Sequence, residues 1–413
     1  MTTIHESRAP DQVKGKYAAI IVCWVLGAGC LFAWNVLFTI QDYYGHLFPR
    51  YHPSRLLTLA YVPFFFGVLA ALAYNEEKIN TRRRNLIGFT LFFIGSLLLL
   101  VLDLATSGKG GLGTFIGICI ISSSFGVGGA LAEGGMVGDL SLMKPEFIQS
   151  FSAGLAASGV IMSSLRLITK AAFKNSNNGL RKGAILFFAI AAFLELVCVF
   201  LYAFIFPRLP IVKYYRSKAA SQGSKTVSAD LVAGGLQEVE EDTEHLVRLS
   251  VKELLYQNID YALDIFLSHL LTLSIFPGFI AEDTGSHSLG QWYVPVLIAT
   301  NNGFDFVGRY IPMLRFLKLE SRKGLMIFTL LRFLFIPAFY FTAKYGDQGW
   351  MIMLTAALGI TQGYLIVSVL TSAPKGYKGP EQNALGNLLT LSLALGVGLG
   401  VACDFLWLIG KGW

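Results

Sequence analysis

Two oppositely charged residues stand four positions apart inside an apolar stretch of this sequence. Asp305 and Arg309 lie in the run 292–314, and this spacing places both side chains on one face of a helix, the acid nearer its N-terminus. Charge within a lipid bilayer is costly and usually marks a functional site. The pair could simply neutralise itself, or its carboxylate and guanidinium could hydrogen-bond vicinal hydroxyls of a sugar. We favour the second interpretation.

A second acid and a tryptophan also interrupt apolar runs. Glu133 lies among glycines in the run 112–140, with no basic residue within one helical turn. It could accept a proton, hydrogen-bond an amine of a ligand, or be a satisfied structural group. Trp34, in the run 17–40, would usually be a packing residue, but its ring can also stack on a heteroaromatic ring.

Further ionisable residues lie in apolar runs, namely Asp139, Glu195, Asp404 and the four considered next. Asp264 and His269 are five positions apart and therefore not on one helical face, and each could act in gating or proton handling. Arg166 lies near the end of its run and could extend its guanidinium to the membrane surface. Arg332 is nearer the middle of its run and could pair with an acid on another helix.

Membrane-spanning helices must position these residues. The chain has 413 residues, of which 54% are hydrophobic and 14% charged, whereas about a quarter are charged in soluble domains. Because a bilayer core requires about 20 apolar residues per helix, we predict an all-α integral membrane protein with eleven transmembrane helices. The spans are expected at 17–40, 54–74, 85–104, 112–140, 147–169, 183–206, 259–281, 292–314, 324–343, 349–371 and 383–410.

The basic residues predict the orientation. With the N-terminus in the cytoplasm, the inner segments hold more than twice as many Lys and Arg residues as the outer ones, although residues 170–182 oppose this trend. The C-terminus is then outside. The predicted units are a cytoplasmic tail (1–16), a six-helix bundle (17–206), a cytoplasmic loop (207–257) and a five-helix bundle (258–413). Two bundles joined by a long loop suit a rocking transporter.

The sequence lacks the motifs that mark several other classes of protein. The sequence has no P-loop, no nucleophile elbow and no zinc-binding His pair, so we expect neither an ATP-driven pump nor an enzyme. The five cysteines all lie in apolar runs, which predicts no disulfide framework and no metal site. The net charge of +7 comes from short clusters between spans, which indicates topology rather than nucleic-acid binding. No cofactor is expected.

The chain resembles the equilibrative nucleoside transporters, and their plant members most closely, over essentially all eleven spans. The most specific matches are three segments in the eighth, first and seventh spans. Weaker matches lie in the ninth and tenth spans and in the segment between the tenth and eleventh. The specific segments are Phe304-Asp305-Phe306-Val307-Gly308-Arg309, Ala33-Trp34-Asn35 and Ser274-Ile275-Phe276-Pro277-Gly278, and the weaker ones are Leu331-Arg332-Phe333-Leu334-Phe335-Ile336-Pro337, Gly363-Tyr364-Leu365, Pro374-Lys375 and Pro380-Glu381.

This resemblance implies a fold like that of the major facilitator proteins, with six plus five helices around one cavity. It implies that Asp305 and Arg309 bind the ribose hydroxyls and that Trp34 lines the cavity. Glu133 corresponds to a polar residue, often Gln in relatives, that contacts the base, and the departure to Glu puts base preference and proton coupling in question. Ser152 corresponds to a polar contact that some relatives make early in the fifth span.

The resemblance thus predicts transport of nucleosides such as adenosine and uridine by alternating access, either facilitative or coupled to protons. The alternative is a carrier for nucleobases or for another small polar solute such as a sugar. We expect a monomer surrounded by membrane lipids in the plasma membrane, or alternatively in the vacuolar membrane.

Overall fold

The computed structural model describes residues 15–74, 81–141, 143–217, 251–282, 288–375, 377 and 380–409. Within these residues the chain forms helices and no strand. Most of the predicted tail (residues 1–14) and most of the predicted central loop (residues 218–250) lie outside the described residues, so the boundaries of the four predicted units stay predictions.

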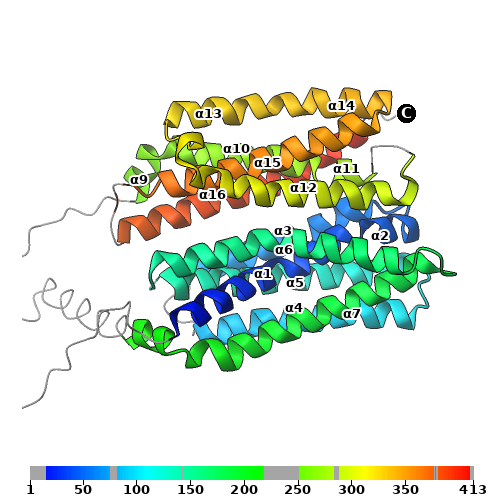
Figure 1. The fold of residues 1–413 in the computed structure, drawn as a ribbon, viewed down its shortest axis with the longest axis horizontal. Helices are drawn as coiled ribbons and strands as arrows, with labels where there is room; N and C mark the ends of the chain where they lie inside the picture. Colours follow the sequence, from blue (N-terminus) through cyan, green and yellow to red (C-terminus); the bar gives the residue numbers. More distant parts are fainter. Residues whose placement is uncertain are drawn as a thin grey trace, which may run out of the picture.

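The helices form two groups that follow one another along the chain (Figure 1). The first group holds α1 (Lys16–Thr39), α2 (Gln41–Leu47), α3 (Pro53–Tyr74), α4 (Thr81–Ala105), α5 (Leu112–Ser141), α6 (Pro145–Ala172) and α7 (Gly179–Phe200). The second holds α9 (Val251–Gln257), α10 (Ile259–Ile275), α11 (Gly278–Glu282), α12 (Tyr293–Tyr310), α13 (Arg322–Leu331), α14 (Phe335–Tyr345), α15 (Gln348–Ser372) and α16 (Pro380–Asp404).

The long helices run roughly parallel or antiparallel to one axis (Figure 1). Helix α1 begins at one end of this axis, which we call the α9 end, and the described chain finishes at the other, which we call the α2 end. Almost all of the buried apolar residues of the first group form one cluster, and most of those of the second group form two separate clusters. Each group therefore has its own core, and the two meet mainly where α6 packs on α12 and α3 packs on α16.

Ten helical segments in the described residues are long and apolar enough to cross a membrane. They correspond to ten of the eleven predicted spans. The remaining prediction, at 292–314, falls on α12, which is a helix of 18 residues but is not among the ten. Its polar residues explain the difference, because Asn301, Asn302, Asp305 and Arg309 lower its hydropathy. The number eleven therefore stays a prediction.

Glycines allow α15 to approach α12 closely, and this contact fixes the helix that bears the charged pair. A Cβ on Gly363 would lie 2.1 Å from the carbonyl oxygen of Asp305, and one on Gly359 would lie 2.4 Å from that of Asn301. No side chain fits at either position without movement of a backbone. Small residues at such contacts let helices pack closely in lipid.

We predict that Gly363→Ala destabilises the protein by about 1–3 kcal/mol, because its methyl group would force α12 and α15 apart. The control is Gly67→Ala in α3, where a Cβ would meet no atom within 4 Å. Thermal unfolding of the purified proteins in detergent measures the difference. Equal unfolding midpoints for Gly363→Ala and Gly67→Ala would contradict the proposed constraint.

Candidate functional site

The predicted ion pair is present on α12. Nε of Arg309 donates to Oδ2 of Asp305 at 2.9 Å, and the two side chains are 25% and 16% exposed. The other carboxylate oxygen, Oδ1 of Asp305, is buried without a hydrogen-bond partner. Among the described residues, the terminal nitrogens of Arg309 also have no hydrogen-bond partner. The pair therefore keeps one acceptor and several donors available for a ligand.

Arg332 lies between α13 and α14, near Asp305, and is only 2% exposed. The prediction of a partner acid on another helix is not met by its hydrogen bonds, all of which go to neutral groups. Nε donates to Thr361 Oγ1 at 3.0 Å, Nη1 to Ser268 Oγ and to Gln362 Oε1 at 2.8 Å, and Nη2 to Thr272 Oγ1 at 2.9 Å. The charge of Asp305 is nevertheless close enough to interact with that of Arg332. Side chains of two helices, α10 and α15, thus hold a buried cation near the α12 carboxylate.

Asp264 and His269 lie on different faces of α10, as their spacing predicts. Asp264 is buried beside Thr329 of α13, and neither carboxylate oxygen has a hydrogen-bond partner in the described structure. His269 is buried against α16, where Gly396 approaches its Cβ, and its Nδ1 lies 2.8 Å from the carbonyl oxygen of Ile265. Only His269 is close to the charges of Arg309 and Arg332.

Trp34 and Glu133 come together around Tyr61 of α3. The rings of Trp34 and Tyr61 have centroids 4.0 Å apart, and Trp34 also packs edge-on against Phe38 at 4.2 Å. The hydroxyl of Tyr61 lies over Gly129 of α5, and Glu133, one turn further along, is close enough to interact with it. Glu133 has no hydrogen-bond partner among the described residues. Tyr61 was not predicted, since a tyrosine in an apolar run gives no signal of its own.

Ser152 is exposed on α6 and makes no hydrogen bond in the described structure. It lies seven positions before Gly159 and eleven before Ser163, so all three share one helical face. That face meets α12, because Nδ2 of Asn302 donates to Ser163 Oγ at 2.8 Å and to the carbonyl oxygen of Gly159 at 3.3 Å. Ser152 thus continues the face of α6 that is turned toward the second group, on the α9 side of that contact.

Ion pairs join the two groups at the α2 end. Arg55 of α3 is fully buried and donates from Nη1 to Glu282 Oε2 of α11 at 2.9 Å and from Nη2 to Asp404 Oδ1 of α16 at 3.4 Å. The hydroxyl of Ser54 and the ring of His52 also bond Glu282. We call these five residues the Arg55 cluster. Of these residues the sequence marks only Asp404, as a charge within an apolar run. Its partners could not be predicted, because the residues that meet here are more than 220 positions apart in the sequence.

A second set of contacts closes the same end. Arg166 is 1% exposed and donates to both oxygens of Asp42, at 3.0 and 2.8 Å, so the expectation that it reaches the membrane surface is wrong. Lys170 shares this carboxylate at 2.6 Å and also donates to the carbonyl oxygen of Gln291 at 2.5 Å. Asp42 belongs to α2, and its proximity could not be read from the sequence.

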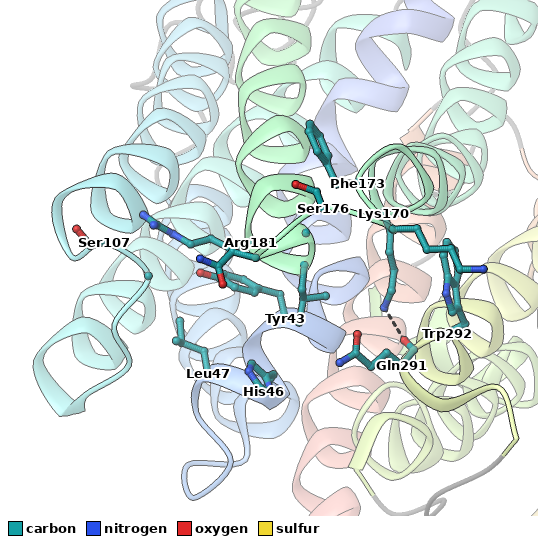
Figure 2. Close-up of a pocket in the computed structure, with 15 residues that line it drawn as sticks. Tyr43, His46, Leu47, Ser107, Lys170, Phe173, Ser176, Arg181, Gln291 and Trp292 are labelled. Atoms are coloured by element: carbon teal, nitrogen blue, oxygen red, sulfur yellow. Dashed lines mark hydrogen bonds between the residues drawn. The ribbon is translucent and has the colours of Figure 1, made fainter.

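A cavity in the described part of the chain lies at the α2 end and not beside Asp305 or Trp34. Its volume is about 520 Å³, and its walls come from α2, the α4–α5 and α6–α7 connections and the segment before α12 (Figure 2). Within the described residues, no three His, Cys, Asp or Glu side chains are grouped so that they could hold a metal ion.

Comparison with known proteins identifies the family. A family model described as nucleoside transporter matches residues 116–409. Equilibrative nucleotide transporters 3 and 6 of Arabidopsis thaliana are 60% and 58% identical to this chain, and each match covers 100% of this chain and 99% of the relative.

Solved structures of transporters share the fold. The inward-open xylose transporter XylE from E. coli matches with a TM-score of 0.61 at 13% identity, over 96% of this chain and 91% of that one. The nucleoside transporter NupG matches with a TM-score of 0.52 at 15% identity, over 95% and 92%. The predicted class, an all-α membrane protein similar to the major facilitator proteins, is confirmed. The chain belongs to the nucleoside transporter family, within its plant equilibrative group, and is a transporter rather than an enzyme.

Proposed function

We propose that this chain carries purine and pyrimidine nucleosides, such as adenosine and uridine, across a membrane by alternating access. The observation that carries the proposal is the incompletely bonded pair on α12. Oδ1 of Asp305 can accept a hydrogen bond from one ribose hydroxyl, and the terminal nitrogens of Arg309 can donate to the other. Because the Asp305 carboxylate and the Arg309 guanidinium already bond each other, they are preorganised for a vicinal diol.

The base would lie toward the first group of helices. Trp34 offers an aromatic face, and Glu133 offers a carboxyl without a hydrogen-bond partner in the described structure. A carboxylate accepts hydrogen bonds from the amines of a base, and a protonated carboxyl can also donate. Ser152 would line the path toward the α9 end rather than contact the ribose, because it lies on the α9 side of the α6–α12 contact. One chain supplies all these residues, so we infer that the monomer is the transporting unit.

The membrane orientation proposed from the basic residues places the α9 end in the cytoplasm and the α2 end outside. The described state is then closed toward the outside by the Arg55 cluster and by the contact of Lys170 with Gln291. Outward opening must break these contacts between the two groups, and nucleoside binding must favour the states differently. The plasma membrane is the proposed location and the vacuolar membrane the alternative.

We predict that Asp305→Asn lowers adenosine and uridine uptake by about 10- to 100-fold, since a hydrogen bond to a charged group contributes about 1.5–3 kcal/mol. The assay is labelled uptake in cells that lack nucleoside transport, with surface expression measured in parallel. Asp347→Asn is the control, because Asn can keep the exposed N-cap of α15. Adenine uptake that survives Asp305→Asn, without adenosine uptake by wild type, would identify a nucleobase carrier instead.

A second prediction concerns protons. Glu133→Gln keeps a hydrogen-bonding side chain but cannot take up a proton, so we expect it to transport adenosine at a rate that does not depend on outside pH. Wild type should transport faster at acidic than at neutral pH and should slow when a protonophore is added. If Asp264→Asn or His269→Gln removes the pH dependence and Glu133→Gln does not, the proton site lies at that other residue.

A third prediction concerns the closed α2 end. Glu282→Gln removes the carboxylate shared by Arg55, Ser54 and His52, so the outward-open state should become more populated. A cysteine placed at Phe276, whose ring lies 6.2 Å from that of Phe38 across the two groups, reports this opening in a cysteine-free background. Its labelling by an impermeant maleimide added outside should be about three- to tenfold faster, which corresponds to roughly 1 kcal/mol.

The control for this measurement is Glu320→Gln, since Glu320 pairs with Lys318 and Lys375 at the α9 end. Equal labelling rates in the wild-type, Glu282→Gln and Glu320→Gln proteins would show that the Arg55 cluster does not hold the outer side closed.

A further inference from the structure

The cavity at the α2 end has a basic lining that nucleoside transport does not explain. Its walls include His46 and three cations, Lys170, Lys174 and Arg181, but no Asp or Glu. Figure 2 labels His46, Lys170 and Arg181. These cations belong to the segment 170–182, where the sequence opposes the general bias of basic residues toward the cytoplasm. A specific requirement for positive charge at this place would account for that exception.

Part of this charge is not compensated by the protein. Asp42 is shared between Arg166 and Lys170, so two cations face one carboxylate. Asp103 balances Arg181, with Nε and Nη2 of the guanidinium 3.0 Å from its side-chain and backbone oxygens. Lys174 is exposed and has no partner among the described residues. The region therefore holds more positive than negative charge.

The neutral residues of the cavity extend its recognition chemistry. The hydroxyl of Tyr43 donates to Asp103, and burial together with this carboxylate raises the pKa of Tyr43, so it remains a neutral phenol. Trp292 lies under Lys170, whose Nζ is 5.4 Å from its ring centroid. Polar side chains of Ser107, Ser176 and Asn178 complete the wall. Cations beside the hydroxyl of Ser107 suit phosphate oxygens, and the rings of Tyr43 and Trp292 suit an attached organic group.

Lys170 is a buried and fixed part of this cavity rather than a mobile surface side chain. It is only 5% exposed, and its Nζ is fixed by Asp42 of α2 and by the carbonyl oxygen of Gln291 from the second group. The cavity is thus formed by both groups of helices, and its two walls would separate when the α2 end opens. A volume of about 520 Å³ is sufficient for a small organic anion.

We propose that this cavity binds a phosphomonoester group, with Lys170, Lys174 and Arg181 around the phosphate. The group could belong to a soluble organic phosphate or to the headgroup of an anionic lipid at the same membrane face. The site is separate from Asp305 and Arg309, and a ligand there is not the transported nucleoside.

The test uses the full-length protein in lipid nanodiscs and measures its thermal unfolding midpoint. In discs of phosphatidylcholine, AMP should stabilise the wild type even when saturating adenosine is present. Lys174→Glu should weaken AMP binding about tenfold, because an attractive charge is replaced by a repulsive one near the phosphate. Lys174→Arg should bind AMP as the wild type does. Lys344→Glu, a charge reversal at the same end but outside the cavity lining, should do so as well.

A second arm replaces AMP with phosphatidic acid added to the discs. Stabilisation by AMP that depends on Lys174 identifies a soluble phosphate as the ligand, and the same dependence with phosphatidic acid alone identifies a lipid headgroup. The proposal is overturned if neither ligand stabilises the protein, if Lys174→Glu responds as Lys344→Glu does, or if adenosine abolishes the effect of AMP. Because adenosine uptake is a separate readout, failure here leaves the assignment of Asp305 unaffected.

Discussion

The structure depends on the placement of one polar helix among apolar ones. Helix α12 carries Asp305 and Arg309, and a helix with these charges is costly to expose to lipid. It is instead packed between α15 and α6. Gly359 and Gly363 let the α15 backbone approach, while Asn302 hydrogen-bonds α6. The helix that forms the candidate binding site is therefore also one of the two helices through which the second group mainly contacts the first.

Two kinds of buried charge follow from this arrangement. All three guanidinium nitrogens of Arg332 donate hydrogen bonds to hydroxyl and amide oxygens. These bonds compensate for the water that the buried charge has lost. Asp305, in contrast, has one buried carboxylate oxygen, Oδ1, without a hydrogen-bond partner. A buried group without a partner costs about 1–3 kcal/mol, and a ligand that supplies the missing hydrogen bond recovers that cost. Arg332, whose hydrogen bonds are all made within the protein, therefore supports the fold, whereas Asp305 remains available to a substrate.

The α2 end combines closure with an excess of positive charge. Arg55 and Arg166 are both buried there, and each depends on carboxylates from a distant part of the chain. Arg55 bridges the two groups through Glu282 and Asp404, whereas Arg166 and Lys170 share Asp42 within the first group. Buried ion pairs lose much of their Coulomb energy to desolvation, so such contacts stabilise a closed state without making it irreversible. Reversible closure is what alternating access requires.

The sequence by itself determined the features that depend on local spacing. Ten of the predicted spans follow from run length, and the Asp305–Arg309 pair follows from a separation of four residues on a helix. The resemblance to known transporters, carried by short segments, identified the family. Only the tertiary structure decided the partners of Arg332 and Arg166, the meeting of Trp34 with Glu133 around Tyr61, and the basic cavity. These contacts join residues far apart in the chain, and the hydropathy of a run does not specify which face of a helix meets which neighbour.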